Sequence, residues 1–410
     1  MRKILLSALI LTACVANAQE AVPTQVKTEP IENAGNVLFG PYIQKVETDE
    51  ATVVWVTDGE TVTMAGGEES LTREDYKVHT VRFDRLKANT KYNYNLGSGL
   101  GGTFKTAPDG APNFRFAVYG DTRTREEEHQ KVVDGMRKHE NIDFVLNTGD
   151  LVSHGQNLDN WKSFFKVAGP LMASTYYVPC LGNHESNATE FFDFFVLPNN
   201  ENWYSFNWGE VHFIALNTEP DDIADGMPKV AETDLYRSKQ MWEYFAKQRA
   251  WLEKDLQENQ WAKFIVVYFH VAMYDSKTSR RENQLEIRTA FGDLIDKYNV
   301  ELVLNGHTHN YQHHKKGLTH YVVTGGGGAP LYDIEDSIGV SDVEIIRQEQ
   351  STHYCIVDVE GPKLKVQSFF PDGSPIEEFS VESQSGTRAV RERLKSIGGL
   401  PWEKDAAKAE

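Results

Sequence analysis

Short runs of alternating apolar and polar residues fill residues 37–108. The clearest are ATVVWVTD, HTVRFDRL, KYNYNLG and GGTFKTA, which are rich in β-branched and aromatic side chains and are separated by Gly, Asn and Asp. No helical stretch of useful length interrupts them. The pattern predicts a small all-β sandwich. The Pro/Gly-rich stretch APDGAPN at 107–113 indicates a domain boundary.

The pattern changes over residues 112–384, where apolar runs alternate with stretches of helical spacing. The runs FRFAVYGD, DFVLNTGD, TYYVPCLGNHE and KFIVVYFH predict strands, and residues 125–140, 160–172, 237–258 and 282–298 predict helices. Such alternation predicts a layered α/β domain. Residues 19–36 are polar without periodicity and indicate a flexible lead, and residues 385–410 form a mixed-charge tail.

The N-terminus is typical of an export signal. MRK is basic, ILLSALILTACV is apolar but too short to span a bilayer, and ANA precedes Gln19. We therefore predict a signal peptide at residues 1–18 and a periplasmic or secreted protein. The alternative is a lipoprotein, because LTAC resembles a lipidation box that would anchor the chain at Cys14. No other apolar run is long enough for a transmembrane segment.

Charge and cysteine content narrow the functional classes. The net charge of −18 argues against nucleic-acid binding, which normally needs a basic face. An acidic protein that handles anions needs a local positive centre, and a bound metal would provide one.

After signal removal only Cys180 and Cys355 remain, both in apolar stretches. Buried free thiols are expected, with a single disulfide as the alternative.

Five predicted strands end in residues of the metal-ligand type. They are Asp121, Asp150, Asn183 with His184, His270, and His307 with His309. Ligands bind at the carboxyl ends of strands in α/β sheets. Two Asp, one Asn and three His form an oxygen and nitrogen set that is too large for one tetrahedral zinc with an open position. The set suits two metal ions that share a bridging carboxylate.

These motifs resemble those of a known family. GD at 120–121, GD at 149–150, GNHE at 182–185, His270 and GHTH at 306–309 look like the five ordered motifs of calcineurin-like metallophosphoesterases. GPYIQKVETDEATVVWVT is similar to the fibronectin-type domain that precedes the catalytic domain in purple acid phosphatases. The resemblance spans roughly Leu38 to Asp372, so residues 37–108 are expected to be fibronectin III-like and 112–384 catalytic.

The resemblance implies a role for each site residue. Two divalent ions (Mn, Zn or Fe) would share Asp150. The first would also bind Asp121 and His309, and the second Asn183, His270 and His307. A metal-bridging hydroxide would attack the phosphorus, while His184 would bind the phosphoryl group or protonate the leaving oxygen.

The expected substrate is a phosphorylated small molecule, and a phosphomonoesterase resembling acid phosphatases is the first interpretation. A phosphodiesterase or nucleotidase is the alternative. A non-catalytic protein that binds phosphate or metal is a third possibility.

Two positions depart from the family pattern. Ser153 stands where purple acid phosphatases place an iron-binding Tyr, and Arg123 stands where the wider superfamily supplies a His ligand. Arg123 has two interpretations: a structural or surface arginine, or a fork that clamps the substrate phosphate. Beyond GHTH, we expect His313 and His314 in a solvated turn and Tyr311 in the pocket wall. TGGGGAP at 324–330 predicts a tight turn near the site.

Overall fold

The computed structural model describes residues 24–26, 36–59, 68–111, 113–220, 231–335 and 339–389. The predicted signal peptide, Cys14 and most of the predicted lead and tail lie outside the described residues. Within the described residues, no helix combines the length and the apolar character needed to cross a bilayer.

The N-terminal region folds as two β-sheets, as its alternating pattern predicts. One sheet has the order β2-β3-β5-β4 and the other β1-β6-β7. The strands are β1 (Thr24–Gln25), β2 (Val37–Gln44), β3 (Ala51–Asp58), β4 (Glu68–Thr72), β5 (Tyr76–Phe83), β6 (Lys91–Gly97) and β7 (Leu100–Lys105). Phe83 of one sheet stacks on Phe104 of the other, with 6.0 Å between ring centroids. The core of this sandwich therefore lies between its two sheets.

Strand β1 lies within residues 19–36, which the sequence predicts to be a flexible lead. Thr24 and Gln25 pair in parallel with Tyr92 and Asn93 of β6, and the backbone N–H of Val26 donates to the Asn93 carbonyl at 2.9 Å. A strand of two residues is too short to leave a periodic signal in the sequence.

Two larger sheets form the second region. The six-stranded sheet has the order β10-β9-β8-β18-β19-β20, and the seven-stranded sheet β11-β12-β13-β14-β16-β15-β17. The first contains β8 (Phe114–Tyr119), β9 (Phe144–Asn147), β10 (Tyr176–Pro179), β18 (Tyr354–Glu360), β19 (Lys363–Phe369) and β20 (Pro375–Glu382). The second contains β11 (Tyr204–Trp208), β12 (Val211–Ala215), β13 (Phe264–Val271), β14 (Leu302–Gly306), β15 (Tyr311–Lys316), β16 (Thr319–Thr324) and β17 (Glu344–Glu349).

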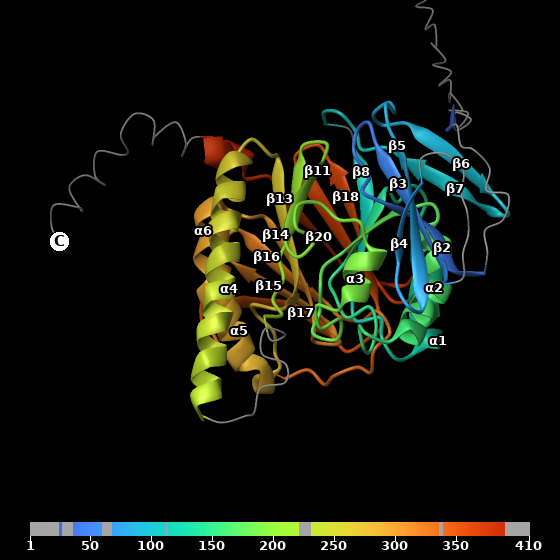
Figure 1. Ribbon diagram of the computed structural model, residues 1–410. Helices are drawn as coiled ribbons and strands as arrows, with labels where there is room; N and C mark the ends of the chain where they lie inside the picture. The colour runs from blue at the N-terminus through green and yellow to red at the C-terminus, as the bar shows by residue number, and fades with distance from the viewer. Residues whose placement is uncertain are drawn as a thin grey trace, which may run out of the picture.

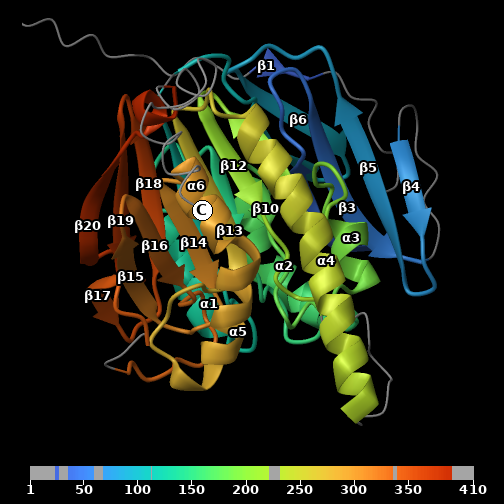
Figure 2. The same cartoon turned by 90° about the vertical axis from the view of Figure 1, so that its left-hand side faces the viewer.

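Helices cover the outer faces of these sheets, which gives the predicted layered α/β architecture (Figures 1 and 2). Helices α1 (Glu126–Met136) and α2 (Leu158–Met172) lie beside the six-stranded sheet. Helices α4 (Ala231–Glu258), α5 (Arg281–Ile287) and α6 (Asp293–Tyr298) lie on the seven-stranded sheet. The described residues also include α3 (Thr189–Phe194), a 3₁₀ turn (Thr278–Arg280) and a π turn (Arg288–Gly292).

Two buried cores hold the layers together. Between the sheets, Phe116 and Phe213 meet edge to face with 5.3 Å between centroids. Between the seven-stranded sheet and its helices, a second core includes Ile214, Leu252 and Phe291. The burial of this apolar surface, which is non-directional, is the main driving force for the arrangement.

The sandwich packs directly on the α/β region, and the larger core runs through both. The Phe39 ring stacks on Phe165 of α2 at 4.1 Å, and the Tyr42 hydroxyl donates to the Phe194 carbonyl at 2.6 Å. Arg73 forms a two-pronged ion pair with Asp193. These contacts join the sandwich to the elements that flank the strand ends described below.

The prediction of a solvated turn at His313 and His314 is wrong. Both side chains lie in β15, which pairs with β16 on one side and β17 on the other, and they are 1% and 0% exposed. Tyr311, in the same strand, is buried and donates to Glu377 at 2.8 Å, so it packs in the interior rather than in a pocket wall. Cys180 and Cys355 are buried free thiols, as expected.

Candidate metal centre

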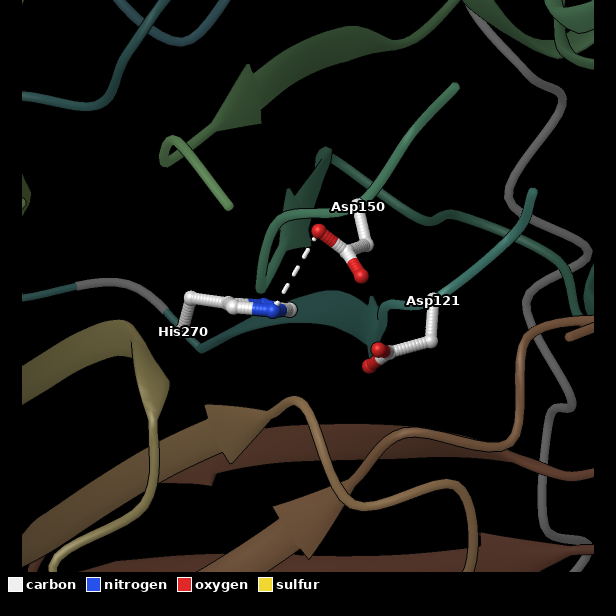
Figure 3. A group of neighbouring side chains, drawn as sticks. All are labelled: Asp121, Asp150 and His270. Carbon is white, nitrogen blue, oxygen red and sulfur yellow. Dashed lines mark ion pairs between the residues drawn. The ribbon is translucent and has the colours of Figure 1, made fainter. Parts of the chain in front are cut away.

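Polar side chains from both larger sheets meet at one end of the strands. Asp121, Asp150 and Asn183 follow the parallel strands β8, β9 and β10. From the other sheet, His270 lies in β13 and His307 follows β14. Figure 3 shows Asp121, Asp150 and His270 facing a common space, and one ligand atom from each lies within 4.8 Å of the others. The strand ends therefore converge as expected.

The backbone at these turns is strained. Asp121, Asp150 and His307 have positive φ angles of 58°, 56° and 67°. Such conformations cluster at functional sites, where the surrounding structure holds them. The glycines of the motifs are needed for close approach. A Cβ on Gly182 would lie 2.4 Å from the Asp150 Oδ1, and one on Gly306 would lie 2.6 Å from the Asp121 Oδ2.

The six candidate ligands fall into two groups. In the larger group, Nε2 of His270 lies 3.3 Å from Asp150 Oδ1, 3.2 Å from Asn183 Oδ1 and 3.2 Å from His307 Nδ1. The smaller group is Asp121 with His309, whose Nε2 lies 3.2 Å from Asp121 Oδ1. Four of the candidate ligands thus gather around the His270 ring, and the other two lie together.

Hydrogen bonds to the backbone orient the imidazoles of His270 and His309. His270 Nδ1 lies 2.8 Å from the Thr148 carbonyl, and His309 Nδ1 lies 2.6 Å from the Pro330 carbonyl. A carbonyl only accepts, so each Nδ1 carries the hydrogen and, in the neutral ring, Nε2 presents a lone pair. Those lone pairs face carboxylate or amide oxygens, which are also acceptors. A cation between them removes the repulsion, so the donor set fits bound metal.

The pKa shifts of the site histidines also indicate that the buried carboxylates need a nearby positive charge. Burial lowers the pKa of His270, but the adjacent Asp150 carboxylate outweighs burial and raises that pKa to about 10. Burial and the charge of His270 hold the pKa of His307 well below its usual range. A proton on His270 thus balances the carboxylate charge when no ion does, and metal binding replaces such protons.

Glu185 is a site residue whose role the sequence analysis missed. Its fully buried carboxylate accepts backbone N–H bonds from Asp150 and Gly182, both at 2.8 Å, and from Val152 at 3.1 Å. Burial and the charge of Asp150 raise the pKa of Glu185. One side chain therefore ties together the turns after β9 and β10. Its place in GNHE was visible in the sequence, but its partners were not.

Arg123 and His184 lie on one side of Asp150. The Arg123 Nε lies 3.4 Å from Asp150 Oδ2, and the side chain is 14% exposed. The His184 ring is half-buried, with Nδ1 2.8 Å from the Ser153 carbonyl and Nε2 3.8 Å from Asp150 Oδ2. The structure thus places Arg123 at the centre, not on the outer surface, and leaves the His184 Nε2 directed into it.

A glycine-rich turn holds the opposite side, as expected for residues 324–330. The backbone N–H groups of Gly327 and Ala329 donate to the carbonyls of Gly120 and Asp121, both at 2.8 Å. Arg125 donates to the Gly328 and Ala329 carbonyls. The nearby Tyr332 stacks on His309 with 4.1 Å between centroids, and no sequence signal marked it. The turn therefore holds the backbone of Asp121 in place, and Pro330 and Tyr332 hold the His309 ring.

The chain is similar in sequence to known phosphoesterases. Residues 114–311 match the protein-family profile described as calcineurin-like phosphoesterase. Purple acid phosphatase 22 of Arabidopsis thaliana is 26% identical over 261 residues, which cover 58% of this chain and 54% of the relative. Acid phosphatase type 7 of Mus musculus is 29% identical over 269 residues, covering 58% and 57%. The chain thus spans about half the length of these relatives.

Two solved structures share the fold. A purple acid phosphatase from yellow lupin seeds superimposes with a TM-score of 0.65 at 18% identity, covering 83% of this chain and 74% of the other. The structure of PhoD superimposes with a TM-score of 0.58 at 15% identity, covering 86% and 92%.

Proposed function

We propose that the chain is a metal-dependent phosphoric ester hydrolase acting on small phosphomonoesters, because residues 114–311 match the calcineurin-like phosphoesterase family. The observation that carries the proposal is the convergence of two carboxylates, one amide and three imidazoles at one end of the strands. That donor set suits two divalent ions of Mn, Zn or Fe.

The two donor groups divide the ligands between two sites. Asp150, which has a ligand atom within 4.8 Å of ligand atoms of both Asp121 and His270, is the shared ligand in this proposal. Asp121 and His309 complete the first site. The second site is completed by Asn183, His270 and His307. Bound ions would stabilise charge on the phosphoryl oxygens and lower the pKa of water.

His184 and Arg123 are the residues that act on the substrate in this proposal. Water supplies the oxygen of the new bond to phosphorus, the ester bond to phosphorus breaks, and the alcohol leaves with a proton. His184 is placed to give that proton from Nε2, because its Nδ1 is held by the Ser153 carbonyl. Arg123 has a planar fork suited to phosphate, and its position beside Asp150 supports a clamping role.

Turnover of two aryl esters tests the proposal. Protein reconstituted with Mn²⁺ or Zn²⁺ should hydrolyse p-nitrophenyl phosphate faster than the bis(p-nitrophenyl) ester. The reverse preference would make the chain a phosphodiesterase. Absence of turnover of either ester, with metal bound, would contradict hydrolysis and favour a binding protein.

We further propose that the chain is exported and that its N-terminal sandwich is a fibronectin III-like domain. The basic and apolar start of the sequence supports export. Mass spectrometry of protein from an exporting host should give a mature N-terminus at Gln19. A lipidated Cys14 would instead establish membrane anchoring, and an intact Met1 would contradict export.

A further inference from the structure

A pocket of about 540 Å³ opens beside the metal centre. It lies between the turns after β8 and β9 and the starts of α1 and α2. Arg123 and Ser153 belong both to its lining and to the centre, since Arg123 contacts Asp150 and the Ser153 carbonyl holds His184. Its volume falls in the range of small-molecule sites. A substrate whose phosphoryl group lies at the centre can therefore extend into this pocket.

The lining presents polar groups that can bind hydroxyls. They come from His154, Asn160 and Ser163. Asn160 uses its Oδ1 to accept from the His154 backbone N–H, and Ser163 donates to Glu126. His154 is an exposed residue of this lining. Imidazole, amide and hydroxyl groups offer both donors and acceptors, which an alcohol group can match.

The charged groups of the lining do not favour a second anionic group on the substrate. Among the lining residues in the described part of the chain, Arg123 is the cation and Glu126 the carboxylate. Arg123 is engaged with Asp150 and Glu126 is paired with Lys166, so these side chains offer no unpaired cation to a second anionic group. Bonds from Lys166 and Ser163 hold the pKa of Glu126 below its usual range, so it stays ionised.

The pocket offers little exposed aromatic surface on which a nucleobase could stack. The aromatic ring of Phe164 is 3% exposed and the imidazole of His129 is 2% exposed, and the two rings stack on each other. A base that needs an open aromatic face to stack on would find little here.

We propose that this pocket receives the alcohol part of the substrate and selects neutral, polyhydroxylated alcohols, so that sugar and polyol monophosphates are the preferred class. The inference rests on the proposed phosphomonoesterase function. His154 and Glu126 are its specificity-determining residues: His154 bonds a hydroxyl, and Glu126 neutralises Lys166, so that no free cation there favours a second anion.

The test compares kcat/KM for glucose 6-phosphate, 3-phosphoglycerate, AMP and p-nitrophenyl phosphate on the full, metal-reconstituted chain. The wild type should prefer glucose 6-phosphate. His154→Ala should lower kcat/KM for glucose 6-phosphate about 2- to 10-fold, as one lost hydrogen bond implies. Inhibition by inorganic phosphate should not change, because phosphate occupies only the centre.

Glu126→Gln supplies the charge test. It should raise kcat/KM for 3-phosphoglycerate roughly 2- to 5-fold, the size of a partly exposed charge interaction. Glu127→Gln is the matched control, because it removes the same charge at the next position, which lies outside the lining. The Glu127→Gln variant should leave kcat/KM unchanged for all four substrates.

Each outcome decides between the two proposals. Turnover of all substrates without preference, or equal effects of His154→Ala on every ester and on phosphate inhibition, would overturn the pocket assignment alone. Failure of the metal-loaded wild type to hydrolyse any of the four esters would overturn the phosphomonoesterase proposal and the pocket assignment with it.

Discussion

Glu185→Gln is expected to loosen the metal centre by disrupting one defined set of hydrogen bonds. Oε2 of Glu185 accepts from the backbone N–H groups of Asp150 and Gly182, and Oε1 accepts from Val152. An amide has one oxygen, so glutamine can accept either the two bonds that Oε2 accepts or the one that Oε1 accepts, but not both sets. If it keeps the two bonds to Oε2, its NH₂ group faces the Val152 N–H, and two donors are buried against each other.

The magnitude follows from that mismatch. A buried donor left without a partner costs about 1–3 kcal/mol, so the free energy of unfolding should fall by about that amount. The backbone of Asp150 is one of the groups held, and losing support behind a metal ligand typically weakens metal affinity roughly 10- to 100-fold.

The assay is urea unfolding of the metal-free and metal-loaded protein, together with titration of the metal-free protein with Zn²⁺ or Mn²⁺. Glu301→Gln is the matched control. Glu301 is also fully buried and accepts backbone N–H bonds, from Ile265 at 2.8 Å and Gln384 at 2.7 Å, beside Arg388. The Glu301→Gln variant should have a lower free energy of unfolding than the wild type and an unchanged metal affinity. A Glu185→Gln variant with wild-type stability and affinity would refute the reasoning.

Four further outcomes are expected. His184→Ala should lower kcat about 10²- to 10⁴-fold with bound metal unchanged, as a proton donor does; loss of metal by elemental analysis would make it a ligand. Phe39→Ala should cost about 3–5 kcal/mol in urea unfolding, because its ring is buried across the domain interface. A chain starting at Ala111 should aggregate in light scattering, since removing the sandwich exposes the shared core; a monodisperse, folded product would contradict this. Burial lowers the pKa of His353 to about 4 from 6.5, so the unfolded state takes up its proton first and stability should fall by up to about 1.4 kcal/mol per pH unit from pH 6.5 toward pH 4. Melting curves at pH 7 and pH 5 should show a smaller loss in His353→Gln.

The elements around the centre were predictable because the signals for them are local. The strands that end before Asp121, Asp150 and His307 are short apolar runs followed by glycine and a polar residue, and both the periodicity and the turn can be read within ten residues. Once several such ends occur in an α/β pattern, their convergence at one edge follows from sheet geometry.

The errors arose where partners lie far apart in the sequence. His313 was expected in a turn, but its strand is flanked on both sides and its ring lies 3.0 Å from Glu377, which is 64 positions away. The role of Glu185 depends on N–H groups 33 and 35 positions away. Periodicity reports which face of an element is apolar, and it does not report which polar groups will meet in the interior.

The number of metal ions per chain, measured together with turnover, tests the central claim most directly. Wild-type protein equilibrated with Zn²⁺ or Mn²⁺ and then desalted should retain two ions per chain and hydrolyse p-nitrophenyl phosphate. Asp121→Asn should weaken one site, whereas Asp150→Asn should weaken both because that carboxylate is the shared ligand. One ion per wild-type chain, or two ions and undiminished turnover in Asp150→Asn, would contradict a two-metal centre built around Asp150.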